Sequence, residues 1–155
     1  MNCIKIKQLT FSSFLLSINL LIIFITNSNT LLFIFTPISI ILMINNCQLR
    51  YTINYTVSLI LSSILYDPLF CLIYIIPYLC IGFSIGVFKK INITKTKVIL
   101  ISFMINLCAH LLLIIIFNIN LYFLIFILLY CLSQVIIIYF IYDEYFKNVS
   151  KIIKK

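Results

Sequence analysis

The sequence predicts an all-α, polytopic integral membrane protein, a six-helix transmembrane bundle that forms a single domain over residues 1–155. Three observations support this class. Hydrophobic residues make up 65% of the chain and charged residues only 9%, whereas a soluble domain is about half apolar and a quarter charged. Long apolar runs follow one another with short polar connections, and the basic residues are confined to alternate connections.

Crossing the hydrocarbon core takes about 20 mostly apolar residues. Six runs approach this length, and we predict helices over residues 9–26, 31–47, 51–67, 69–88, 98–117 and 121–142. The start of the chain resembles a signal peptide, but no A-x-A-like cleavage site follows the first run, so we expect it to remain a membrane helix. The second and third runs are short and contain polar residues.

The positions of the eleven basic residues predict the topology. They precede the first run, separate the second from the third and the fourth from the fifth, and follow the sixth: Lys5, Lys7, Arg50, Lys89, Lys90, Lys95, Lys97, Lys147, Lys151, Lys154 and Lys155. Because cytoplasmic loops are enriched in lysine and arginine, we expect both termini to be cytoplasmic. The net charge of +8 then reflects membrane topology, and we expect no nucleic acid as a partner.

Asp67 is the first acidic residue in the chain, and Pro68 follows it directly. Proline does not continue a helix and suits a tight turn, so we place both residues in the outer turn between the third and fourth helices. Two interpretations stay open. The carboxylate is a hydrated group in a turn, or it faces the bundle interior or a partner, because ionisable groups within a membrane are costly and often functional.

Small residues mark candidate packing faces. Gly82 and Gly86, the two glycines of the chain, form a G-x-x-x-G motif that lets helix backbones approach closely, within the bundle or against a partner. Ser13 and Ser17 offer a similar but weaker face on the first helix. Pro37 and Pro77 fall within the second and fourth runs, where we expect kinks.

His110 is the one histidine in the chain and falls in the fifth run. It is a neutral imidazole bonded to a neighbouring helix, or it pairs with Asp67 to bind a cation or a partner group. Catalysis needs paired groups, and the sequence offers no Ser-His-acid set, no metal-ligand spacing and no glycine-rich phosphate loop. We therefore expect no enzyme, no metal and no cofactor. We interpret the six cysteines as small apolar residues.

Residues 143–155 form a basic cytoplasmic tail. Apolar and basic residues alternate in it at near-helical spacing, so it can lie on the inner membrane surface, held by anionic membrane lipid. A basic tail that only obeys the topology rule is the other interpretation.

The stretch FTPISIILMINNCQLRYTINYTVSLILSSILYDPL resembles the rod-shape-determining protein MreD family. The matching features are a proline that opens the second helix, a short basic loop, and a small residue four positions before an aspartate: Pro37, Arg50, Ser63 and Asp67. Ser63 stands where the family usually has glycine. The lysines after Phe88 match the basic end of the family's next helix.

The resemblance implies a non-catalytic scaffold subunit of the bacterial cell-elongation machinery in the inner membrane. Its partner would be the bitopic protein MreC, and Asp67 would lie on or beside the surface that meets it. The chain is also similar to the substrate-binding S components of energy-coupling-factor vitamin transporters, in which Ser13 and Ser17 would contact the coupling subunit. A small membrane protein related to neither is the third alternative.

Overall fold

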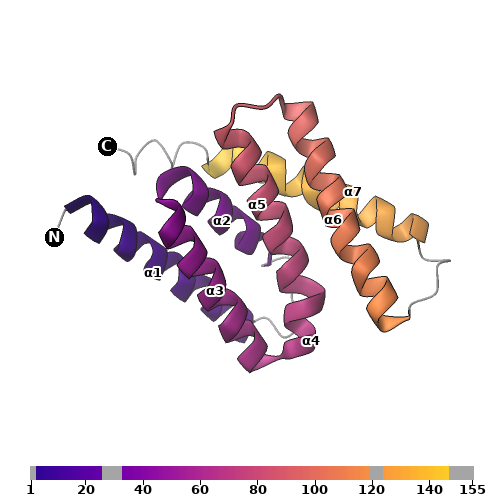
Figure 1. Cartoon of the computed structure of the whole chain (residues 1–155), viewed down its shortest axis with the longest axis horizontal. Coiled ribbons are helices and arrows are strands. Elements are labelled where there is room, and N and C mark those ends of the chain that lie inside the picture. The colour runs from indigo at the N-terminus through magenta and orange to yellow at the C-terminus, as the bar shows by residue number, and fades with distance from the viewer. Residues whose placement is uncertain (1–2, 26–32, 119–123, 147–155) are drawn as a thin grey trace.

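The computed structural model describes residues 3–25, 33–118 and 124–146, and these residues are helical apart from short connections. The prediction of an all-α fold is confirmed for them. Six helical rods follow one another (Figure 1): α1 (Cys3–Ile25), α2 (Phe35–Asn46), α3 (Leu49–Tyr66), the composite rod of α4 (Pro68–Phe70), π-helical η2 (Cys71–Ile75) and α5 (Ile76–Lys90), α6 (Lys95–Phe117), and α7 (Leu124–Ile141) with π-helical η4 (Tyr142–Phe146).

Four of the rods are long and apolar enough to cross a membrane: Lys5–Ile25, Pro68–Lys90, Lys95–Phe117 and Leu124–Phe146. The other two fall short for different reasons. The described part of α2 is apolar but has 12 residues, which span about 18 Å at 1.5 Å per residue. α3 has 18 residues but is less apolar than its neighbours. The structure thus supports a multi-pass membrane protein, and six complete spans stay a prediction.

Helix boundaries agree best where the sequence carries a strong local signal. The break between the third and fourth rods falls at Asp67, as expected. Asn92 and Asn118 adopt left-handed conformations after α5 and α6, with φ of 61° and 51°. Asparagine accepts this conformation readily and commonly ends helices. α1 and α6 start earlier than expected, at Cys3 and Lys95. The predicted tail begins inside η4, and its residues 147–155 lie outside the described part.

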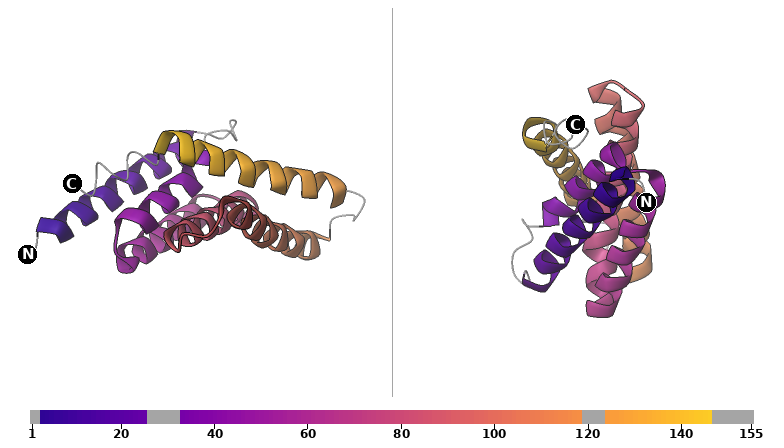
Figure 2. Two further views of the ribbon diagram at one scale, coloured as in Figure 1. Left: turned by 90° about the horizontal axis from the view of Figure 1, so that it is seen from above. Right: turned by 90° about the vertical axis from the view of Figure 1, so that its left-hand side faces the viewer.

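α2 is the centre of the molecule. Every residue from Thr36 to Ile44 is buried, because α5, α1, α3 and η4 all pack on α2. The rods of α6 and α7 reach this core only near their basic ends, through Val98 of α6 and Val135, Ile138 and Tyr139 of α7. α6 packs on the outer side of α5, and α7 packs on α6, so these two helices extend away from α1 and α3 as a separate arm (Figures 1 and 2).

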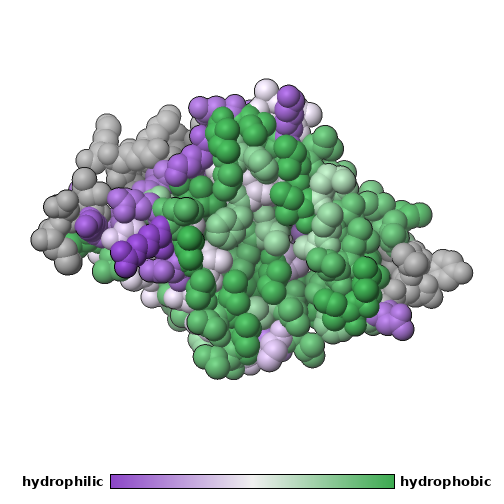
Figure 3. All heavy atoms as spheres, viewed as in Figure 1, coloured by the Kyte–Doolittle hydropathy of each residue, from purple (hydrophilic) through white to green (hydrophobic). Residues whose placement is uncertain are grey.

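The outer surface is strongly apolar. Large hydrophobic side chains are exposed on every described rod except α2, including Leu65 at 87% and Ile115 at 75%. Figure 3 shows an apolar surface over α3, α5 and α6, with hydrophilic residues gathered toward one edge. A soluble monomer rarely exposes so large an apolar area, whereas lipid covers such a surface without cost.

Candidate functional site

Asp67 caps the helix that follows it. Its Oδ1 accepts hydrogen bonds from the backbone N–H groups of Leu69 at 2.9 Å and Phe70 at 3.2 Å. Pro68 takes the first helical position, where its missing N–H leaves no bond unmade. Both residues are exposed. The carboxylate therefore fixes the turn locally, and its second oxygen remains accessible for an outside contact.

The composite rod contains a π-helical turn at Cys71–Ile75, directly before α5. Pro77 lies in the first turn of α5 and cannot donate the hydrogen bond that an α-helix requires there. The π turn accommodates this loss, since Ile76 donates to the carbonyl of Cys71. Single π turns are rare and often lie at functional sites, and this one places Tyr74 at the end of the α6–α7 arm.

Gly82 and Gly86 bring α5 against α2. A Cβ atom added at Gly82 would lie 2.8 Å from the carbonyl oxygen of Pro37 and 2.9 Å from its Cα. At Gly86 the nearest atom is Cδ1 of Ile44, at 2.8 Å. The structure thus uses the G-x-x-x-G motif inside the bundle, where side chains on α5 would force the two backbones apart.

Ser13 and Ser17 lie on the outside of α1. The buried stripe of this helix consists of Leu15, Asn19 and Ile23, and both serines are exposed. The hydroxyl of Ser17 donates to the carbonyl of Ser13 at 3.0 Å. The two serines therefore belong to a face of α1 that the described bundle leaves open to lipid or to a partner.

A buried polar cluster, which the sequence reasoning missed, joins the first three helices. The amide nitrogen of Asn19 donates to Ser39 at 3.0 Å and also contacts the hydroxyl of Tyr55, while its oxygen accepts from Thr36 at 3.0 Å. All four side chains are buried. Buried polar groups must be satisfied, so this cluster fixes how α1, α2 and α3 dock. The signal was available, since Asn19 is a lone amide within an apolar run.

A charged cluster joins the basic ends of the rods. Lys89 contacts Asp143 at 2.7 Å, and Lys95 contacts the other oxygen of Asp143 at 3.5 Å. The ammonium group of Lys89 also lies 4.2 Å from the ring centre of Tyr139 and 4.5 Å from that of Tyr142. Asp143 falls in the predicted tail, whereas the structure shows that it joins the end of α5 to the start of α6.

His110 belongs to the inward stripe of α6. The stripe repeats every four residues, and its buried members are Val98, Ser102, Asn106 and Ile114. Nδ1 of His110 lies 3.0 Å from the carbonyl oxygen of Asn106. The imidazole also meets the ring of Tyr130 on α7 edge-on, with 5.9 Å between the ring centres.

Polar side chains of three helices meet beside His110. The amide nitrogen of Asn106 donates to Gln134 at 3.2 Å, and the hydroxyl of Tyr78 on α5 lies near the side chains of Gln134 and Tyr130. The sequence reasoning singled out His110 but not its neighbours. Among the described residues no hydrogen bond or ion pair joins His110 to Asp67, so the structure does not bring the suggested pair together.

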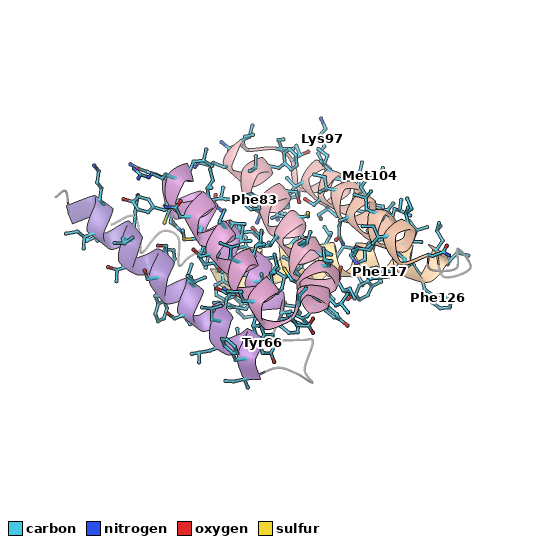
Figure 4. All side chains as sticks on the ribbon, turned by 60° about the horizontal axis from the view of Figure 1, so that its bottom comes forward. Tyr66, Phe83, Lys97, Met104, Phe117 and Phe126 are labelled. Atoms are coloured by element: carbon cyan, nitrogen blue, oxygen red, sulfur yellow. The ribbon has the colours of Figure 1, made fainter. Side chains whose placement is uncertain are left out.

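An open groove of about 530 Å³ lies along α5 between α3 and α6. Its walls are aliphatic and aromatic, and Phe83 (labelled in Figure 4) and Phe88 belong to them. Thr56 and Ser84 also line it, but their hydroxyls donate to their own helices, to Thr52 at 2.9 Å and Ile81 at 3.0 Å. The groove therefore presents an apolar surface with small residues at its base.

Comparisons of the chain with protein-family models, with curated proteins and with solved structures found no match.

Proposed function

We propose that the protein is a non-catalytic scaffold subunit in the bacterial inner membrane, of the kind that the resemblance to the MreD family implies. It would join a bitopic partner, such as MreC, to the cell-elongation machinery by helix packing. The observation that carries this proposal is the groove between α3, α5 and α6. No other described feature combines an elongated apolar surface along a helix with small residues at its base.

The groove suits a single transmembrane helix. Its residues on α5 run from Ile76 to Phe88, a length of about 18 Å along the helix axis. Helices associate in membranes through close packing over small residues, which Thr56, Cys80 and Ser84 supply. Phe83 and Phe88 would form the rim against which bulky side chains of the partner pack.

The proposed topology has six membrane helices with both termini in the cytoplasm. It is supported by the alternating basic connections and by the contacts of Asp143 with Lys89 and Lys95, which hold three rod ends at one edge. Cysteines introduced in a cysteine-free variant test it. An impermeant thiol reagent should modify Lys97→Cys from the cytoplasmic side only and Asn118→Cys from the outside only. The reverse pattern would reject the topology.

A matched pair of native cysteines tests the groove. Cys80 lines it, whereas Cys108 is exposed on α6 and is not part of its lining. Cys80→Phe should fill the groove and lower the recovery of the bitopic partner from solubilised native membranes at least fivefold. Cys108→Phe should leave recovery unchanged. Equal recovery with both variants would show that the partner binds elsewhere.

The alternative is a substrate-binding subunit of a vitamin transporter. Its support is the exposed position of Ser13 and Ser17 on α1, the face that would meet a coupling subunit. The same pull-down distinguishes the two proposals, because a transporter subunit should recover a coupling protein with nucleotide-binding domains. Ser13→Leu should then abolish that recovery, while Cys80→Phe should not affect it.

A further inference from the structure

A second cavity, separate from the groove, lies between η2, α6 and α7. Its volume is about 520 Å³, within the range of about 300–1,000 Å³ that is typical of ligand pockets. Aliphatic side chains and the ring of Phe117 form most of its wall, and Figure 4 shows Phe117 toward the end of α6 that lies away from Lys97. Three polar side chains also line it: Tyr74, His110 and Tyr130.

The hydrogen bonding of His110 determines what this cavity can recognise. A backbone carbonyl only accepts hydrogen bonds, so the contact with Asn106 requires that Nδ1 carries the proton. In a neutral imidazole the other nitrogen, Nε2, is then an acceptor. No described residue donates to Nε2. His110 therefore brings a hydrogen-bond acceptor to a wall that is apolar apart from the hydroxyls of Tyr74 and Tyr130.

The aromatic groups are held in place around this acceptor. Tyr130 lies edge-on to the imidazole and has the hydroxyl of Tyr78 near it. Tyr74 belongs to the π-helical turn, so its side chain leaves the rod in a different direction from that in a regular α-helix. Aromatic rings in the lining favour a flat ligand, because aromatic rings pack best against other rings at offset or edge-on contacts.

We propose that this cavity binds a small, flat and mostly apolar molecule that carries a hydroxyl or N–H group, whose hydrogen is accepted by Nε2 of His110. Aromatic alcohols fit this chemistry, and fully substituted ethers or hydrocarbons do not. The proposal does not depend on the scaffold function, since the cavity and the groove share no lining residue.

The test uses the single histidine as its reporter. The full chain, purified through a tag without histidine and placed in lipid nanodiscs, is labelled at the histidine ring nitrogens and observed by NMR. Naphthol should shift the Nε2 resonance in a saturable manner. Methoxynaphthalene, which lacks the hydroxyl hydrogen, should bind about tenfold more weakly, the effect of about 1.4 kcal/mol.

Two neighbouring positions on α7 supply a filling variant and its control. Ile127 lines the cavity, whereas Phe126 (Figure 4) is 70% exposed and is not part of the lining. Ile127→Trp should abolish the saturable shift, and Phe126→Trp should leave it unchanged, with the histidine resonance visible in both. An equal response to the two probes, a shift that never saturates, or the same shift in Ile127→Trp would overturn the proposal.

Discussion

The seam between α2 and α5 and the arm formed by α6 and α7 are built in opposite ways. Nine consecutive residues of α2, from Thr36 to Ile44, are buried. In α6, which has 23 residues, the buried ones are Val98, Ser102, Asn106 and Ile114. The seam has glycines that allow backbone contact, while the arm buries fewer residues and leaves a cavity. Stability should therefore concentrate in the seam, and ligand binding in the arm.

The largest expected effect comes from Gly82→Ala in the seam. The new Cβ would meet the backbone of Pro37 at 2.8 Å, which cannot move without shifting α2, so we expect a loss of about 2–3 kcal/mol. Unfolding in a mixed-detergent titration measures it. Leu112→Ala, at a side chain of α6 that is 60% exposed, is the control and should change little. If both variants unfold alike, the seam is no more critical than the arm.

Gly86→Ala sharpens the comparison within the seam. Its nearest contact is the flexible end of the Ile44 side chain, which can rotate away, so we expect a loss of about 1 kcal/mol or less. The same titration should place this variant between wild type and Gly82→Ala. A loss as large as that of Gly82→Ala would mean that Ile44 has no room to move.

The buried polar cluster around Asn19 and the polar side chains around Asn106 allow a second comparison. Asn19 contacts Thr36, Ser39 and Tyr55, so Asn19→Leu should leave buried groups unpaired at a cost of about 2 kcal/mol. Asn106→Leu should cost about 1 kcal/mol, because its amide bonds Gln134 at 3.2 Å and reaches the carbonyl of Cys131 only at 3.5 Å, and interhelical hydrogen bonds in membranes are worth about that much. The opposite order in the titration would contradict the assignment of stability to the first three helices.

The charged cluster at the basic ends should contribute less. Lys89→Gln should cost about 1 kcal/mol at low salt, because its side chain is 16% exposed in contact with Asp143. Lys95→Gln should cost about 0.3 kcal/mol, since its side chain is 75% exposed and exposed ion pairs contribute little. Unfolding at low and high salt measures both, and a loss for Lys89→Gln that is insensitive to salt would point to the tyrosine rings as its main partners.

The sequence allowed the rods and their order to be predicted, because spanning helices need long apolar runs and because turns carry distinctive residues such as Asp67 and Pro68. It could not show which helix is central. The apolar residues of α2 resemble those of the exposed helices, and only three-dimensional packing distinguishes a buried isoleucine from one that faces lipid. The pattern of apolar and polar residues, which identifies the buried face of a helix in a soluble protein, therefore does not identify it here.

The candidate sites likewise combine features that the sequence indicates with features that only the structure shows. The spacing of Gly82 and Gly86 indicated close packing, but the partner helix was not recognisable from the sequence. His110 was recognisable as a rare residue, whereas Tyr74, Tyr78 and Tyr130 were not distinguished from the other tyrosines of the chain. Their meeting depends on the π turn and on the placement of α7 against α6, which are tertiary features.

Substitutions of Asp67 should have only a modest effect on stability. Asp67→Ala removes the acceptor of two backbone N–H groups and should cost about 1 kcal/mol, while membrane insertion stays intact. Asp67→Asn keeps a capping oxygen without the charge and should cost only a few tenths of a kcal/mol. Membrane fractionation and the same unfolding titration measure these effects.

The same pair separates the cap from a role in partner binding. If the charge of Asp67 meets the bitopic partner, both variants should lower its recovery in the pull-down, although only Asp67→Ala loses stability. If the residue only shapes the turn, Asp67→Asn should recover the partner as wild type does. Full recovery by both variants would reject the contribution of Asp67 to partner binding and leave it as the residue that ends α3 and starts α4.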